Sequence, residues 1–158
     1  MILDLRGNPG GYLDAAVDMA SWFLEKGKPV VREDAGNGQA ETVYRSSGYD
    51  IFNDNLKMII LVDNGSASAS EILAGALQEY KIAKLVGTKT YGKGSVQQLL
   101  SIPDGASLKV TIAKWLTPSG KSISDGGLTP DVEVKLTEAD FKAGKDPQME
   151  KALQLLAN

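Results

Sequence analysis

The sequence predicts a single domain of the α/β class, with a mostly parallel sheet and covering helices. Apolar segments of strand length alternate along the chain with segments in which apolar residues recur at helical spacing. This order is typical of βαβ units, in which a helix returns the chain to begin the next parallel strand. With 158 residues, of which 42% are hydrophobic, the chain can bury one core and is too short for two ordinary domains. Residues 1–158 are therefore expected to form one domain.

The first third of the chain predicts a strand, a helix and a hairpin. Residues 1–5 are predicted as a buried strand, and strands at 29–32 and 41–45 are expected to pair around the turn Gly36-Asn37-Gly38. The intervening helix, which Gly27 ends, is predicted by a face that carries Leu13, Ala16, Val17, Ala20, Phe23 and Leu24.

The remainder predicts further strands and three more helices. The apolar run at 57–62 predicts a buried strand, and strands are also expected at 83–87, 95–101 and 107–116. A helix directly after the strand at 57–62 is predicted by an apolar stripe of Ala69, Ile72, Leu73, Ala76, Leu77 and Tyr80. The tail from Thr137 predicts a short helix and then a second one, whose apolar face carries Met149, Ala152, Leu153 and Leu156.

The chain contains no histidine and no cysteine, which restricts its chemistry. A Ser-His-Asp triad, a Cys-His pair and a zinc site built on those residues are excluded, so a serine nucleophile would need lysine or a carboxylate as its base. The net charge of −3, with both signs interspersed, gives no basic patch for nucleic acid. We interpret residues 1–5 as a strand rather than a secretory signal, and no apolar run approaches the roughly 18 residues of a membrane span. No metal or organic cofactor is implied.

A run of small residues surrounds Ser68, where a strand is expected to turn into a helix. A nucleophile elbow needs small residues two positions before and after its serine, and Ser66 and Ser70 meet that demand. The backbone N–H of Ala69, at the helix start, would be free to donate to a developing oxyanion. The alternative is that Ser68 and Glu71 form a capping box, which stabilises the helix start without any chemistry.

Lys93, which stands between Gly92 and Gly94, is the best candidate for the base. A lysine must lose its proton to act as a base, and burial in an apolar pocket favours that loss. The alternative is an exposed loop lysine. A phosphate-binding loop over Gly87–Gly94 is disfavoured, because Gly94 stands where that motif needs Ser or Thr and residues 96–100 favour a strand where it needs a helix.

Four motifs in one order resemble the carboxyl-terminal processing peptidases, also called tail-specific proteases. They cover nearly the whole chain: Leu3-Asp4-Leu5-Arg6-Gly7-Asn8-Pro9-Gly10-Gly11, Gly65-Ser66-Ala67-Ser68-Ala69-Ser70-Glu71-Ile72, residues 86–97 with Thr88-Lys89-Thr90-Tyr91-Gly92-Lys93-Gly94-Ser95-Val96-Gln97, and Gly127-Leu128-Thr129-Pro130-Asp131. The resemblance implies a crotonase-like or ClpP-like core and a serine-type endopeptidase that uses a Ser-Lys dyad.

The resemblance also implies a role for individual residues. Ser68 matches the nucleophile, Lys93 the general base, and Gln97 the residue that holds the lysine. The oxyanion donors would be the backbone amides of Ala69 and of the Gly10-Gly11 pair, of which we favour Gly10. Glu71 and Thr90 match positions that support the site, so the capping role of Glu71 is compatible with catalysis by Ser68.

Members of this family are longer than this chain, so we expect it to be the C-terminal part of a bacterial protein that is secreted or membrane-anchored. In that protein a PDZ domain would capture the C-terminal carboxylate of a polypeptide substrate by strand addition. The alternative is a catalytically silent fragment or binding module with the same fold. Because the strand with Leu3 and Leu5 begins without a preceding segment, we also expect an exposed sheet edge and self-association.

Overall fold

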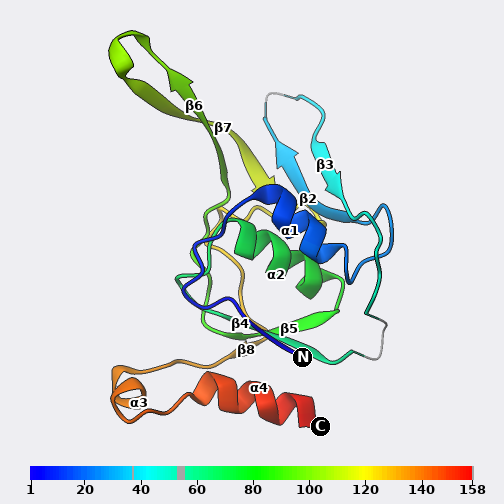
Figure 1. Cartoon of the computed structure of the whole chain (residues 1–158), viewed down its shortest axis with the longest axis vertical. Helices are drawn as coiled ribbons and strands as arrows, with labels where there is room; N and C mark the ends of the chain where they lie inside the picture. Colours follow the sequence, from blue (N-terminus) through cyan, green and yellow to red (C-terminus); the bar gives the residue numbers. More distant parts are fainter. Residues whose placement is uncertain (37, 53–55, 158) are drawn as a thin grey trace.

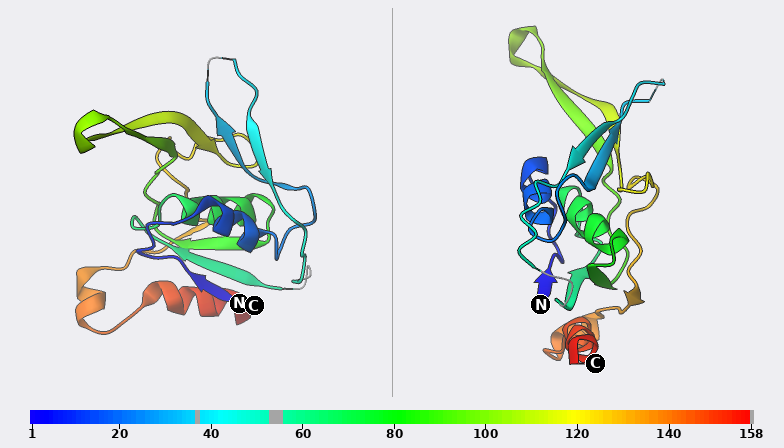
Figure 2. Two further views of the ribbon diagram at one scale, coloured as in Figure 1. Left: turned by 45° about the horizontal axis from the view of Figure 1, so that its top comes forward. Right: turned by 90° about the vertical axis from the view of Figure 1, so that its right-hand side faces the viewer.

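The computed structural model describes residues 1–36, 38–52 and 56–157, and it arranges them in layers (Figures 1 and 2). Helices α1 (Leu13–Ala20) and α2 (Ala69–Glu79) lie between two four-stranded sheets. Beyond the first sheet, α3 (Glu138–Lys142) precedes α4 (Pro147–Ala157), and α4 packs on the outer face of that sheet. No helix of the described residues is long and apolar enough to cross a membrane.

The first sheet is parallel throughout and confirms the predicted fold class. Its strands lie in the order β1-β4-β5-β8, with bounds Ile2–Asp4, Met58–Val62, Ala83–Gly87 and Val132–Glu133. Every residue of β4 is buried, because helices cover both of its faces. Ile60 and Val62 join the main core with α2, whereas Ile59 and Leu61 pack with Ala152 of α4.

The second sheet is antiparallel and was not predicted as a separate sheet. Its order is β3-β2-β7-β6, with bounds Thr42–Arg45, Pro29–Asp34, Ser107–Leu116 and Ser95–Ser101. The predicted pairing of β2 with β3 is confirmed, although Asn37 of the expected turn lies outside the described residues. The β6–β7 hairpin extends away from the body and closes through the short 3-10 helix Pro103–Gly105 (Figure 1).

Two helices differ from the prediction. Helix α1 ends at Ala20, and the chain continues in turns in which Phe23 N and Leu24 N both donate to Ala20 O at 3.1 Å. Phe23 and Leu24 are buried all the same, in the turns that follow. In α4, Leu153 was expected on the apolar face but is 56% exposed.

Leu153 is exposed because the parallel sheet covers only one side of α4. The buried Ala152 lies in the contact between α4 and the sheet. The leucines packed beside it are Leu155 and Leu156 rather than Leu153. Strand β8 was not predicted, because a strand of two residues is too short to show an alternating apolar pattern.

Arg6 fastens the start of α4 to the loop after β1. Its Nη1 donates to Asp146 Oδ1 at 2.9 Å and to Gln148 Oε1 at 3.0 Å, and its Nη2 donates to Asp4 Oδ2 at 2.7 Å. The buried Gln148 side chain in turn donates to the backbone carbonyl of Val134 at 2.8 Å. The hydrogen bonds from Arg6 lower the pKa of Asp4 and the pKa of Asp146.

We predict that Arg6→Ala lowers the free energy of unfolding at neutral pH by about 1 to 2 kcal/mol, because it removes charge-assisted bonds at a partly buried site. A lowered carboxyl pKa stabilises the fold above the ordinary aspartate value of 3.8, and this contribution is lost as the pH falls below it. The difference between wild type and variant should therefore shrink in acid.

Thermal unfolding followed by circular dichroism, at neutral pH and well below pH 3.8, measures both effects. Lys142→Ala is the control, because Lys142 pairs with Glu138 on an exposed surface where one ion pair adds about 0.5 kcal/mol or less. A difference between wild type and Arg6→Ala that stays constant across this pH range would contradict the assignment.

Candidate active site

Ser68 occupies a sharp turn between β4 and α2, as predicted. Its backbone has φ 55° and ψ −120°, in the left-handed region that non-glycine residues adopt only under strain. The flanking Ser66 and Ser70 are buried, so only small side chains fit there. Ser66 has its own structural task, since its hydroxyl donates to Leu5 O at 2.7 Å and accepts from Asp63 N at 3.0 Å.

The glutamate half of the predicted capping box is present. The backbone N–H of Ser68 donates to Glu71 Oε2 at 2.9 Å, whereas Glu71 N donates to the backbone carbonyl of Ser68 at 2.8 Å. Helix capping and a strained serine therefore occur at the same residue, and neither arrangement excludes the other.

Glu71 is fully buried, and its carboxylate accepts four hydrogen bonds from two separate loops. Oε2 accepts from the backbone N–H groups of Ser68 and Lys93, each at 2.9 Å. Oε1 accepts from Gly92 N at 2.7 Å and from Thr90 Oγ1 at 2.6 Å. One carboxylate oxygen thus joins the turn of the candidate nucleophile to the backbone of the candidate base.

The loop that carries Lys93 is held from its other side by the last of the four motifs. Leu128 N donates to Thr90 Oγ1 at 2.7 Å, and Thr90 N donates to Leu128 O at 3.1 Å. A methyl group on Gly92 would lie 2.8 Å from Gly127 N, so the two loops approach at a distance that only glycine allows. The motif at Gly127–Asp131 therefore supports the base loop, a role that the sequence did not reveal.

The side chains of Lys93 and Gln97 are exposed, contrary to the expectation of a lysine directed into a pocket. Within the described part of the chain, neither side chain makes a hydrogen bond. Gln97 lies in β6, where it pairs with Thr111. The structure thus brings the backbone of Lys93 to the site but shows no contact between the side chains of Lys93 and Gln97.

Gly10 and Ala69 meet beside Ser68. A methyl group on Gly10 would lie 2.8 Å from Ala69 N and 2.9 Å from Ser68 Cβ, so Gly10 packs directly against the turn. Ala69 N and Gly11 N donate no hydrogen bond to any described residue. Gly10 N, by contrast, donates to Asn8 Oδ1 at 3.0 Å. The preference for Gly10 over Gly11 as oxyanion donor stays a prediction.

Two further polar residues hold these loops together, and the sequence analysis assigned neither a role. Asp63 Oδ1 accepts from Gly7 N and from Gly65 N, both at 2.8 Å. The carbonyl of Asn8 accepts from Ala67 N at 3.0 Å. Asp63 directly follows a buried strand and precedes a glycine by two positions, which is the usual setting of an aspartate that bonds its own loop.

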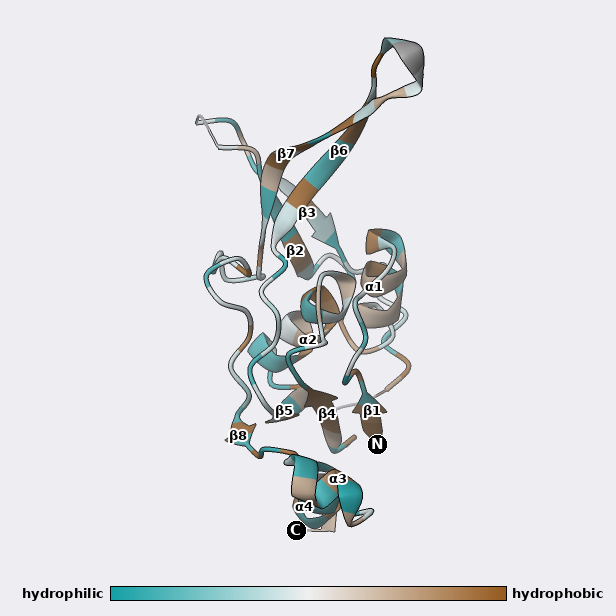
Figure 3. Cartoon of the chain, turned by 90° about the vertical axis from the view of Figure 1, so that its left-hand side faces the viewer, coloured by the Kyte–Doolittle hydropathy of each residue, from teal (hydrophilic) through white to brown (hydrophobic). Residues whose placement is uncertain are grey.

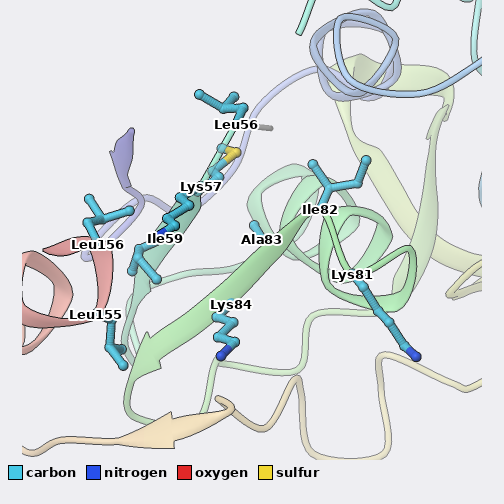
Figure 4. A pocket seen from close by; sticks show the side chains of 10 residues that line it. Leu56, Lys57, Ile59, Lys81, Ile82, Ala83, Lys84, Leu155 and Leu156 are labelled. Atoms are coloured by element: carbon cyan, nitrogen blue, oxygen red, sulfur yellow. The ribbon is translucent and has the colours of Figure 1, made fainter. Parts of the chain in front are cut away.

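A hollow of about 380 Å³ lies at the opposite end of the parallel sheet (Figure 4). Met58 and Ala83, the first residues of β4 and β5, line it together with Leu155 and Leu156 of α4. Ser68 and Lys93 follow the last residues of these strands. The hollow is therefore separate from the candidate site.

We predict that Glu71→Gln disrupts the site and lowers the free energy of unfolding by about 2 to 4 kcal/mol. The amide nitrogen that replaces one carboxylate oxygen cannot accept, so buried donors lose their partner. Chemical denaturation measures this loss. Glu79→Gln is the matched control, because Glu79 accepts from Thr117 Oγ1, Ser119 N and Ser119 Oγ away from Ser68.

The control variant should lose stability but keep any activity per folded molecule, whereas Glu71→Gln should lose both. Equal stability of Glu71→Gln and wild type would show that the four hydrogen bonds do not hold the site.

Comparison with known proteins places this arrangement in a family. Residues 1–134 match the sequence model of Peptidase family S41. A probable CtpA-like serine protease of Staphylococcus epidermidis is 46% identical over 134 residues, which cover 85% of this chain and 27% of that protein. A probable CtpA-like serine protease of Staphylococcus aureus is 42% identical, over 98% of this chain and 33% of that protein. The chain thus spans about a third or less of these curated relatives.

Solved structures agree with the sequence matches. A photosystem II D1 C-terminal processing protease has a TM-score of 0.76 and 36% identity, over 85% of this chain and 34% of that one. A peptidase-like structure from Parabacteroides merdae, with a TM-score of 0.82 and 23% identity over 99% of this chain and 51% of that one, shares the fold. Since the family match covers most of the sequence and all four motifs, the chain belongs to peptidase family S41.

Proposed function

We propose that this chain is the core of a serine-type endopeptidase in which Ser68 is the nucleophile and Lys93 the general base. The observation that carries the proposal is the shared acceptor: Glu71 Oε2 bonds the backbone N–H groups of both residues. A serine nucleophile in a chain without histidine needs lysine or a carboxylate as its base, and this shared acceptor joins the backbone of a lysine to the turn that carries the serine. Membership of family S41 supports the same chemistry.

The reaction proceeds through an acyl-enzyme. Lys93 Nζ accepts the hydroxyl proton as Ser68 Oγ attacks a peptide carbonyl carbon, and the oxyanion accepts hydrogen bonds from Ala69 N and from an amide of the Gly10-Gly11 pair. Collapse of the tetrahedral intermediate breaks the C–N bond, and Lys93 returns the proton to the leaving amine. Water then attacks the ester and gives one proton to Lys93. As the ester C–O bond breaks, Lys93 returns that proton to Ser68 Oγ, and the carboxylic acid is released.

In this proposal Gln97 orients the lysine, and the exposed Lys93 needs to be covered before it is an effective base. A bound polypeptide and the remainder of a longer protein would exclude water from it. We therefore expect the isolated chain to be weakly active and a longer protein to be more active. The match to a C-terminal processing protease supports cleavage near the tails of polypeptides, with a PDZ domain of the longer protein as the tail-binding partner.

The test is incubation with a peptide that carries an apolar C-terminal tail, with products identified by mass spectrometry. Ser68→Ala should abolish cleavage, and Lys93→Arg should do the same because a guanidinium stays protonated. Gln97→Ala should only weaken cleavage. Ser70→Ala and Lys89→Arg are the controls and should retain measurable activity.

Cleavage by Ser68→Ala at the wild-type rate would overturn the assignment of the nucleophile, and full turnover by Lys93→Arg would overturn that of the base. The same assay on the longer protein separates an incomplete enzyme from a silent one. If the longer protein also fails to cleave but binds the peptide, the chain is a binding module and the proposal is wrong.

A further inference from the structure

We propose that two copies of this chain pair through the free edge of strand β6, antiparallel and centred on Gln98. The proposal concerns an interaction surface and does not depend on catalysis by Ser68. Strand β6 is the outermost strand of its sheet and lies on a hairpin that extends from the body (Figure 1).

The four sheet edges differ in how well they resist pairing with another chain. Strand β8 has two residues, and β1 has three, of which Asp4 is bound by Arg6. Strand β3 has four residues and ends in Arg45. Strand β6 has seven residues, Ser-Val-Gln-Gln-Leu-Leu-Ser, with neither a charge nor a proline. Short strands, charges and prolines are what normally protect an edge, so β6 is the least protected of the four.

Large apolar side chains accompany this open edge. The hydropathy colouring shows hydrophobic residues along the extended hairpin (Figure 3). Those exposed by more than 40% are Leu99 (67%), Leu100 (42%), Ile102 (44%), Leu108 (50%) and Ile112 (45%). An edge strand with this much exposed apolar surface is typical of an interface.

A second copy fits this edge because the strand is complementary to itself. In antiparallel pairing centred on Gln98, Val96 lies opposite Leu100 of the second copy and Gln97 lies opposite Leu99. Gln98 lies opposite its own counterpart, where the two side-chain amides can exchange hydrogen bonds. A two-fold axis repeats every one of these contacts, as an isologous dimer requires.

The neighbouring strand β7 extends this complementarity. Leu100 pairs with Leu108 and Val96 pairs with Ala113 within one copy, so the dimer would form an apolar row of Leu108, Leu100, Val96 and Ala113 across four strands. Lys109 pairs with Leu99, which places the row Lys109, Leu99, Gln97 and Thr111 on the other face. No two like charges meet in either row. This register therefore favours a second copy as the occupant of the edge.

Substituting Gln98, the residue on the two-fold axis, with charged residues of either sign tests the register. Sedimentation velocity of the wild-type chain should show a dimer that grows with concentration. Gln98→Lys alone and Gln98→Glu alone should each be monomeric, because each places two like charges opposite one another. An equimolar mixture of the two variants should restore the dimer. Gln39→Lys, at an exposed residue outside the sheet edges, is the control and should dimerise like wild type.

A cysteine at the axis gives an independent measurement, since the natural chain has none. Gln98→Cys should form a disulfide-linked dimer on mild oxidation, because residues directly opposite in an antiparallel pair have Cα atoms about 4.5 to 5.5 Å apart, within the range that a disulfide spans. Gln39→Cys should not. A wild-type chain that stays monomeric at every concentration, or a Gln98→Lys variant that still dimerises, would overturn the proposal. Circular dichroism confirms that each variant is folded.

Discussion

The buried carboxylate of Glu71 is the interaction on which the rest of the site depends. It is the acceptor for the backbone of Ser68 at the start of α2 and for Gly92 and Lys93 in the loop after β5. A carboxylate suits this position because both oxygens accept and neither donates. Without it, the strained turn at Ser68 and the loop at Lys93 would lose the partner that they share, and the backbone bond from Tyr91 N to Ser66 O at 3.0 Å would remain between them.

Two neighbouring strands, β4 and β5, lead to the loops that this carboxylate joins. Strand β4, buried on both faces, leads directly into the turn at Ser68, and β5 beside it leads toward Lys93. Because the strands are parallel, their carboxyl ends lie at one edge, where loops from distant parts of the sequence meet. Gly10 packs on the turn, and Gly127 packs on the base loop. Close backbone approach at glycine therefore adds to the hydrogen bonds of the Glu71 and Thr90 side chains in fixing these loops.

Local features of the sequence predicted much of this arrangement. Strand β6 has the predicted bounds, and the small residues around Ser68 indicated its sharp turn, because both depend on neighbouring residues. The second sheet was not predicted, since β2 pairs with β7 far along the chain and no local pattern reports that pairing. The roles of Asn8 and Leu128 were missed for the same reason. Lys93 was expected in a pocket, but its exposure depends on what surrounds it in space.

Amide hydrogen exchange followed by NMR tests the role of Glu71 most directly, because it reports the individual hydrogen bonds without requiring activity. We expect the amides of Ser68, Gly92 and Lys93 to exchange slowly in the wild-type chain. In Glu71→Gln the amides that face the new side-chain nitrogen, either Ser68 and Lys93 or Gly92, should lose protection, while the amides of β4 keep theirs. Rapid exchange of Gly92 and Lys93 in the wild-type chain, or protection that is unchanged in Glu71→Gln, would contradict the account.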